Sequence, residues 1–379
     1  MMKIPRTSGS DDPVTILFDA PKPRAKAGKA PITITQALAI AAKITSKRGY
    51  APILRCVLVD AFGLSATDLD VHIAIHVLVP GWKGAARPLH AKTLLAAVKA
   101  AGASLATIGP HAVALTTGST IAVETLEAAD FPSFDAGDLP IEFTMPAATL
   151  STMLHRTAHA ISTEETRYYL NGVYLHAQGQ GERATLRAVA SDGHRLVVTE
   201  AELPDGAQGL PGIIIPRGTV KLLCGVLGKQ PEGVVKIKAS DTRIQVTYGP
   251  VTLTSKLIDG TFPEYNLVVP HNPELRMTCP TAELRAAIKA VRVGAERDAT
   301  VALDGHEIQC GANRATLATA KVVKGDHETG FNGQYLMDML EIAGRDVAFF
   351  QNEPASPAIF SDLDDPSWFE VIMPKRVVK

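Results

Sequence analysis

The stretch Ala188-Val-Ala-Ser-Asp-Gly-His-Arg-Leu-Val-Val-Thr199, near the middle of the chain, predicts two β-strands joined by a tight turn. Alternating apolar residues flank the polar trio Ser191-Asp192-Gly193, which suits a hairpin. His194 and Arg195 follow the trio. Asp192 beside His194 is compatible with acid–base catalysis, with a solvated hairpin or with a recognition surface. Neighbours in sequence do not by themselves make a catalytic triad, so the stretch alone leaves all three open.

The rest of the sequence argues against an enzyme. It contains no G-x-S-x-G, H-E-x-x-H, P-loop or G-x-G-x-x-G pattern that would supply a nucleophile, a metal site or a phosphate-binding loop. Other histidines, such as His72, His76 and His111, stand in strand-like or loop-like contexts. We therefore expect no catalytic residue. A hydrolase or nuclease activity that disappears in His194→Ala would revive the enzymatic hypothesis.

Composition limits the class of protein. A length of 379 residues argues for two or three domains, and 46% apolar with 20% charged residues is typical of chains that form real cores. The formal net charge of −1 at pH 7 argues against adhesion to nucleic acid by bulk charge. Contact with DNA therefore requires basic residues that gather on one surface.

The cysteines point to a reducing compartment. They are scattered without C-x-x-C spacing, which predicts neither a zinc site nor a disulfide framework: Cys56, Cys224, Cys279 and Cys310. No apolar run reaches the roughly 18 residues that span a bilayer, and the N-terminus lacks the apolar core of a signal peptide. We expect a soluble, cytoplasmic protein with no membrane contact, no cofactor and no metal.

A repeated pattern follows a distinct N-terminal segment. Residues 1–30 contain a polar tract followed by a basic, Pro-rich tract, which predicts a flexible arm or linker. After it, a short β-prone run leads six times into an apolar-periodic segment of about ten to fourteen residues. The six instances, each with its start signal, begin near Thr33, Pro88, Pro146, Pro216, Pro280 and Asn332, and the helical parts follow from Gln36, Ala91, Ala148, Thr219, Ala282 and Tyr335. Strand-like runs lie between them, so the unit is one helix with a few strands.

Pairs of such units predict the domain organisation. Two units can close a pair of sheets around their helices, which gives an α+β chain of three similar domains. We place the limits at residues 31–141, 142–270 and 271–379.

Several of the predicted helices carry basic stripes opposite their apolar faces. Such a stripe is usually a solvated face, but stripes on several helices of a near-neutral chain indicate a positive surface that attracts phosphates without reading bases. The expected DNA-facing residues are Lys43, Lys47, Arg48, Lys92, Lys99, Arg156, Arg285, Lys289 and Arg292.

At this point the sequence resembles a known family, the bacterial sliding clamp or beta subunit of DNA polymerase III. The resemblance covers roughly residues 31–379 and rests on motifs in the family's order: Ala128-Ala-Asp-Phe-Pro132, Arg167-Tyr-Tyr-Leu-Asn-Gly172, Ala190-Ser-Asp-Gly-His-Arg-Leu196, Thr254-Ser-Lys-Leu-Ile-Asp-Gly260, Phe262-Pro-Glu-Tyr265 and Val371-Ile-Met-Pro374. It implies a clamp fold in which each chain forms half of a ring, with helices lining the hole and sheets outside. It further implies a non-catalytic homodimer that encircles double-stranded DNA and gives the polymerase processivity.

The resemblance also implies a pocket for partner peptides between the second and third domains. Expected partners are the DNA polymerase III alpha subunit, the clamp loader and other proteins with a clamp-binding motif. Apolar walls would accept a Leu or Phe side chain, and polar groups at the rim would orient the peptide. Carried over by motif, the pocket residues are Leu170, Ser191, Gly193, His194, Arg195, Leu196, Pro263, Val268, Val371, Ile372, Met373, Pro374 and Arg376.

The resemblance implies a dimer interface as well, and the chain departs from the family in places. Interface residues would be Ile121, Val123, Arg292 and Val293, with Arg292 replacing an apolar residue. Leu267 stands where an Arg is frequent beside the pocket, and Lys375 where an apolar residue is common. Together with the N-terminal arm and the terminal residues Val378 and Lys379, these departures keep open a second hypothesis. It is a specialised clamp paralogue, from a plasmid, phage or resistance locus, with a narrowed partner set.

Overall fold

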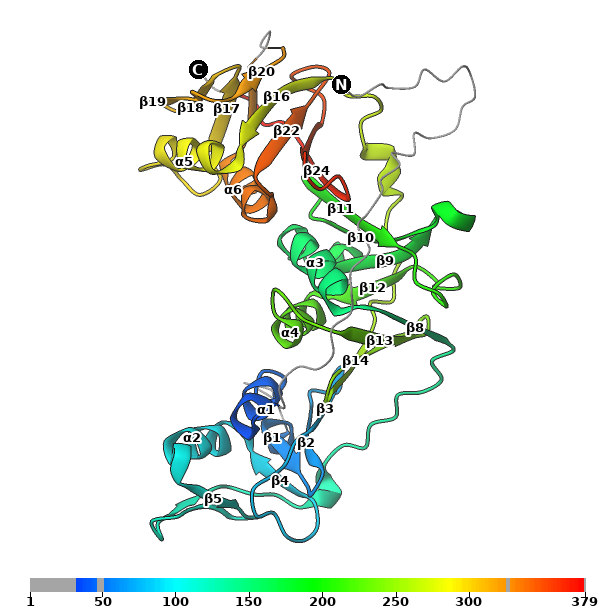
Figure 1. The fold of residues 1–379 in the computed structure, drawn as a ribbon, viewed down its shortest axis with the longest axis vertical. Coiled ribbons are helices and arrows are strands. Elements are labelled where there is room, and N and C mark those ends of the chain that lie inside the picture. The colour runs from blue at the N-terminus through cyan, green and yellow to red at the C-terminus, as the bar shows by residue number, and fades with distance from the viewer. Residues whose placement is uncertain (1–31, 46–50, 325–327, 378–379) are drawn as a thin grey trace.

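The structure is a computed structural model that describes residues 32–45, 51–324 and 328–377, without the side chain of residue 182. Within these ranges the chain forms six α-helices of similar length (Figure 1): α1 (Ile34–Ala41), α2 (Ala91–Ala101), α3 (Ala147–Thr157), α4 (Arg217–Leu227), α5 (Thr281–Val291) and α6 (Gly333–Ile342). All six predicted helical segments are therefore helices. Residues 1–30, predicted to be an arm, lie outside the described part.

Local signals explain where the helices begin. Thr33 caps α1 in a reciprocal capping box with Gln36, and the Asn332 side chain accepts from the backbone of α6. Pro146, Pro216 and Pro280 are extended and immediately precede α3, α4 and α5. Proline needs no backbone hydrogen bond there. Pro88, the start signal of the second unit, lies inside a strand, and the helical part expected from Ala91 begins there as α2 with His90 as its cap.

The strands form two large antiparallel sheets, each of which crosses a domain border. The first, of eight strands, has the order β4 (Arg87–His90), β1 (Cys56–Val59), β2 (Gly63–Thr67), β3 (Val71–His76), β15 (Val251–Lys256), β14 (Arg243–Tyr248), β13 (Val234–Ala239), β8 (Ile141–Pro146). The second, of nine strands, has the order β12 (Ile213–Pro216), β9 (Gly172–Gln178), β10 (Thr185–Ser191), β11 (Arg195–Glu202), β24 (Trp368–Ile372), β23 (Ala358–Asp362), β22 (Asp346–Phe350), β16 (Leu275–Pro280), β20 (Lys321–Val322).

Two smaller sheets lie at opposite ends of the molecule in space (Figure 1). At one end the order is β5 (Leu105–Ile108), β6 (Ala112–Leu115), β7 (Thr120–Ala122). At the other it is β19 (Asn313–Thr316), β18 (Glu307–Cys310), β17 (Thr300–Asp304), β21 (Thr329–Asn332). β7 and β19 are edge strands of these sheets.

One repeating unit accounts for this topology. A helix is followed by three antiparallel strands, as in α3-β9-β10-β11 and α4-β13-β14-β15, and the third strand lies at the outer edge of its set. That third strand pairs with the third strand of the neighbouring domain, β3 with β15 and β11 with β24. The first proposed border, between residues 141 and 142, falls inside β8, after its first residue, and the second falls between Val268 and β16.

The helices and sheets form separate layers along an elongated arc (Figure 1). Within each domain the two helices pack on each other, α1 on α2, α3 on α4 and α5 on α6. All six lie on one side of the arc, and the large sheets form the other side. Leu38, Leu94, Leu154 and Leu336 are fully buried between the layers. The predicted α+β class, with helix pairs packed inside sheets, is confirmed.

Candidate functional site: a docking surface and a basic helix layer

The hairpin from Ala188 to Thr199 closes through an aspartate-capped turn. Asp192 Oδ1 accepts the backbone N–H groups of His194 and Arg195, at 3.0 and 3.1 Å. Gly193 has φ +88, and a Cβ there would overlap the guanidinium of Arg167. The positive φ favours glycine here, while the Arg167 side chain is long enough to move away from a Cβ. The turn therefore presents His194, which is exposed, at the border between the second and third domains.

Leu196 and Val371 are direct cross-strand partners on β11 and β24, so they share one face of the sheet. They belong to an apolar cluster on that face, separate from the main cores, which we call the docking floor: Leu170, Val189, Leu196, Val198, Ile214, Phe262, Tyr265 and Val371. Its members are at most 8% exposed. Residues far apart in sequence thus build one apolar surface between two domains.

An aromatic ladder anchors the segment that borders the docking floor. Phe262 stacks on Tyr174 with ring centroids 4.9 Å apart, and Tyr174 stacks on His176 at 4.6 Å. His176 Nε2 lies 3.0 Å from the hydroxyl of Tyr265. Burial lowers the pKa of His176, which keeps the ring neutral and compatible with the stack. The ladder holds the segment that carries Pro263 and Val268.

Exposed side chains surround the docking floor. Val268 is 51% exposed and Met373 43%, while Pro263 and His194 are also exposed. Met373 follows β24 two residues after Val371, so it lies on the same face, and its N–H donates to the His194 carbonyl at 2.9 Å. The C-terminal segment therefore lies beside the hairpin turn, and together they form part of the rim of the docking floor.

Beyond Met373 the chain turns onto the third domain. Pro374 is half-buried and Arg376 is exposed. The Lys375 N–H donates to the carbonyl of Gly330 at 2.7 Å, and its Nζ donates to the carbonyl of Asp298 at 2.7 Å. Lys375, one of the departures from the family, therefore ties the terminus to β21 rather than to the docking floor. Val378 and Lys379 lie outside the described residues.

The helix layer is positively charged. Within the bounds of α1 to α6 there are seven Lys or Arg and three Asp or Glu, although the whole chain has a net charge of −1. Lys92, Lys99 and Lys289 are exposed on this layer, and Arg285 is exposed but paired with Glu341. Lys43, which follows α1, extends its Nζ next to Gly225 of α4. Lys47 and Arg48 fall outside the described residues.

Comparison with known proteins agrees with this geometry. Residues 144–264 match a family model described as the central domain of the DNA polymerase III beta subunit. The beta sliding clamp of Caulobacter vibrioides strain NA1000 is 34% identical over 368 residues, which span 91% of this chain and 98% of that protein. The chain belongs to the beta sliding clamp family.

Solved clamps have the same fold. The sliding clamp (DNA polymerase III subunit beta) of Bartonella birtlesii, solved bound to griselimycin, superposes with a TM-score of 0.83 at 30% identity, over 91% of this chain and 99% of that one. A Caulobacter crescentus beta sliding clamp gives 0.79 at 32% identity, over 91% and 97%. The family resemblance seen in the motifs is thereby confirmed.

Two of the expected pocket residues of this clamp lie on the wrong face. Arg195 is the cross-strand partner of Ile372, and both alternate with Leu196 and Val371. Since successive strand residues face opposite sides, Arg195 and Ile372 point into the helix side of the sheet. They are 7% and 0% exposed, and Ile372 belongs to the core of the third domain. Neither forms the pocket wall or rim that was predicted.

Besides the paired Arg285, two expected DNA-facing residues of the clamp are partly or largely buried and held by other side chains. Arg156 is 12% exposed, pairs with Asp365 and lies over the Trp368 ring at 5.6 Å, so it joins α3 to the third domain. Arg292 is half-buried and donates to Gln334 Oε1 at 3.2 Å. In both cases an acceptor from the same or the next domain captures the guanidinium before it reaches the surface.

The proposed dimer contact of the clamp also changes in part. Val123 is 4% exposed and packs inside the first domain, so it does not offer an interface side chain. Ile121 on β7 is half-buried, and Val293 after α5 is 72% exposed. The surfaces available for a dimer contact are therefore the edge strands β7 and β19, and not the side chain of Val123.

Sequence reasoning missed two groups of the clamp's site. Lys221 is exposed on α4 and belongs to the basic layer, and its spacing from apolar Val220 and Leu223 could have revealed it. Arg167 lies over Gly193 and is held by Glu164 through two hydrogen bonds, at 2.7 and 2.6 Å. Its motif was recognised, but nothing in the sequence placed it above the turn.

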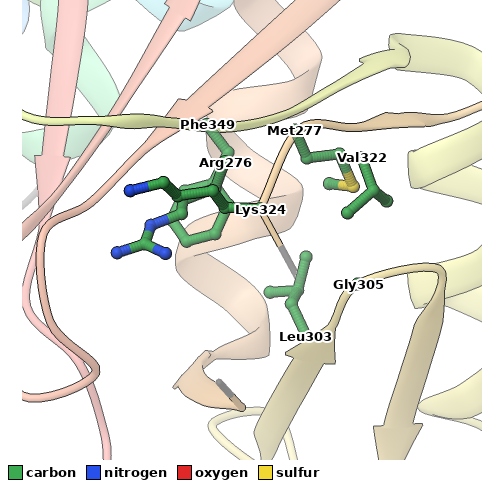
Figure 2. Close-up of a pocket in the computed structure, with 7 residues that line it drawn as sticks. All are labelled: Arg276, Met277, Leu303, Gly305, Val322, Lys324 and Phe349. Carbon is green, nitrogen blue, oxygen red and sulfur yellow. The ribbon is translucent and has the colours of Figure 1, made fainter. Parts of the chain in front are cut away.

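The third domain also contains a small cavity unrelated to either surface (Figure 2). Residues of β16, β17, β20 and β22 line it, among them Met277, Leu303 and Phe349. Its volume of about 10 Å³ leaves room for no more than one water. It is a packing gap rather than a ligand site.

Proposed function

We propose that two copies of this chain close head to tail into a ring around duplex DNA and hold the replicative polymerase on it. The observation that carries this proposal is the repeat of third strands. β3, β15, β11 and β24 each pair across a domain border, whereas β7 and β19 are the equivalent third strands at the two ends of the molecule and are edge strands of their sheets. Pairing β7 of one copy with β19 of the other, and the reverse, would add two further borders of the same kind. Such a head-to-tail contact closes into a ring after two copies.

The charge of the helix layer suits sliding on DNA. The helices would face the hole, where Lys92, Lys99, Lys221 and Lys289 meet the phosphate backbone. Phosphate contacts carry no sequence information and can be exchanged for neighbouring ones, so they permit movement along the duplex. Ring closure, rather than contact strength, would then set the residence time. The role is non-catalytic, requires no cofactor and belongs to the cytoplasm, where the chromosome is copied.

The docking floor suits partner peptides. A Leu or Phe anchor from the polymerase alpha subunit or the clamp loader would bind over Leu196 and Val371, with His194 at the rim. The floor residues are buried, so the anchor requires side chains at the rim to move, and exposed Met373 has three rotatable bonds that let it adapt. Apolar anchoring with polar orientation at the rim is how short peptides gain both affinity and register.

Sedimentation equilibrium at low micromolar concentration tests ring closure. We expect the mass of a dimer, twice the chain mass of 40.2 kDa. A strict monomer at that concentration would contradict the proposal. Electron microscopy of the dimer fraction should then show closed rings. Open dimers or end-to-end filaments would contradict ring closure.

A further inference from the structure

Arg195 lies directly beneath the docking turn, on the helix side of the sheet. Its Nε donates to Asp192 Oδ2 at 3.0 Å, its Nη1 donates to Asp338 Oδ2 at 3.0 Å, and its Nη2 donates to the carbonyl of His159. The guanidinium stacks on the Tyr335 ring at 4.3 Å. A charge that is 7% exposed needs such partners, because leaving it unpaired in the interior is costly.

Asp338 is held rigidly on the third domain. Gln334, one turn earlier on α6, donates to Asp338 Oδ1 at 2.7 Å, while Oδ2 receives Arg195. Leu336 and Met339 on the same helix are fully buried in the core of that domain. The carboxylate therefore has a fixed position relative to the third domain.

Arg195 transmits that position to the turn. Asp192 uses Oδ2 for Arg195 and Oδ1 for the backbone N–H groups of His194 and Arg195. The carbonyl of His194 in turn accepts the N–H of Met373. A continuous series of hydrogen bonds thus leads from α6, through Arg195 and Asp192, to both sides of the docking rim.

We propose that Asp338 is a positioning residue for partner docking: through Arg195 it fixes the turn at residues 192–194 in the shape that orients a bound peptide. This rests on the docking function proposed above and deepens it. Without the Asp338 charge, Arg195 is drawn further toward its remaining acceptors, Asp192 and His159. Asp192 then no longer holds the backbone amides of the turn in place, although every residue that would touch the peptide is unchanged.

A second ion pair at the same border supplies a matched control. Arg156 of α3 pairs with Asp365, and Asp365 also accepts from Ser367. This pair joins the same two domains but makes no hydrogen bond to residues 192–194. If Asp338 serves only to hold the domains together, Asp338→Asn and Asp365→Asn should affect peptide binding alike.

The test measures binding of a fluorescein-labelled hexapeptide ending in Leu-Phe to the full chain by fluorescence anisotropy. We expect Asp338→Asn to bind about ten-fold more weakly than wild type, the loss of a charge-assisted hydrogen bond, and Asp365→Asn to stay within about two-fold. Thermal midpoints of the two variants should fall by similar amounts. In an Arg195→Lys background, Asp338→Asn should add little further loss.

Equal peptide affinity of Asp338→Asn and wild type, or equal losses in the two variants, would overturn the positioning role while leaving docking intact. Absence of binding by the wild-type chain would overturn docking itself and the positioning role with it. Should Asp338→Asn fold poorly, Gln334→Ala removes the bond that orients the carboxylate, along with the acceptor of the Arg292 guanidinium. We expect about a three-fold loss from it, and wild-type affinity would count against the proposal.

Discussion

Leu196 of β11 and Val371 of β24 face each other across the border between the second and third domains, although the hairpin and the C-terminus that carry them are distant in sequence. Their pairing places the apolar floor and its rim on one face of a continuous sheet. Arg195 and Ile372, their immediate neighbours, occupy the opposite face. The border therefore combines an apolar face, which we propose for docking, with an opposite face where buried Arg195 meets Asp338 of α6.

Met373→Ala should weaken peptide docking without unfolding the domain. Met373 is 43% exposed, so its removal leaves no buried cavity, but it takes away contact area beside the floor. We expect affinity for the Leu-Phe hexapeptide to fall by about five-fold or more, as for an interface residue worth about 1 kcal/mol. Leu363→Ala, at 50% exposure elsewhere in the third domain, is the control and should bind normally. Identical peptide affinities of Met373→Ala and Leu363→Ala would show that Met373 does not contribute to peptide binding.

Charge reversal on the helix layer should weaken contact with DNA and its dependence on salt. Each lysine that meets a phosphate contributes about 0.9 to the slope of log affinity against log salt concentration. We expect Lys99→Glu and Lys289→Glu each to lower that slope in a binding titration with a short linear duplex. Lys83, exposed in the β3–β4 connection, serves as the control residue. A slope unaffected by either helix variant would show that the helices do not face DNA.

Arg314→Pro should break the ring without breaking the fold. Cys310 and Asn313 close the β18–β19 hairpin, and the Leu317 N–H donates to the carbonyl of His306. In an antiparallel pair, hydrogen-bonded residue pairs alternate with pairs that are not hydrogen-bonded to each other. Arg314 belongs to the second kind, so its N–H points away from β18. Proline at this position therefore removes a donor only from the free edge of β19. We expect monomers with a thermal midpoint near that of wild type. Arg314→Lys should remain dimeric, and a dimeric Arg314→Pro would rule out pairing through β19.

Acidification should weaken the border between the second and third domains. Burial alone would raise the pKa of Asp365, but the hydrogen bonds from Ser367 and Arg156 outweigh it and hold the pKa below its ordinary value. A carboxyl whose pKa is lowered by folding stabilises the fold above its unfolded pKa, and this stability is lost as pH falls through the folded pKa. We expect the free energy of unfolding to decline below about pH 4, less steeply in Asp365→Asn than in wild type. Equal pH dependence in both would mean that the pair contributes nothing.

Much of the fold follows from local patterns in the sequence. The six helices are marked by Thr, Pro or Asn start signals and by apolar periodicity, and the hairpin at residues 192–194 by its turn residues. These are properties of neighbouring residues. The sheets that cross domain borders depend on pairings such as Leu253 with Ile73, which no local signal reports.

The candidate site was less predictable for two physical reasons. Motif matching selects runs of neighbours, so it joined Arg195 to Leu196 and Ile372 to Val371 although a strand places them on opposite faces. Charged side chains also reach several ångströms, and an acceptor from a distant segment can form an ion pair with them. Asp365 does so for Arg156, and the sequence does not show that the two meet.

Retention on circular DNA tests the central claim most directly. The protein is loaded by its clamp loader onto nicked circular DNA, challenged with about 0.5 M salt, which screens phosphate contacts, and followed before and after the circle is cut once. A closed ring should remain on the circle and leave as soon as the DNA is linear. Equal release from circular and linear DNA would contradict the ring.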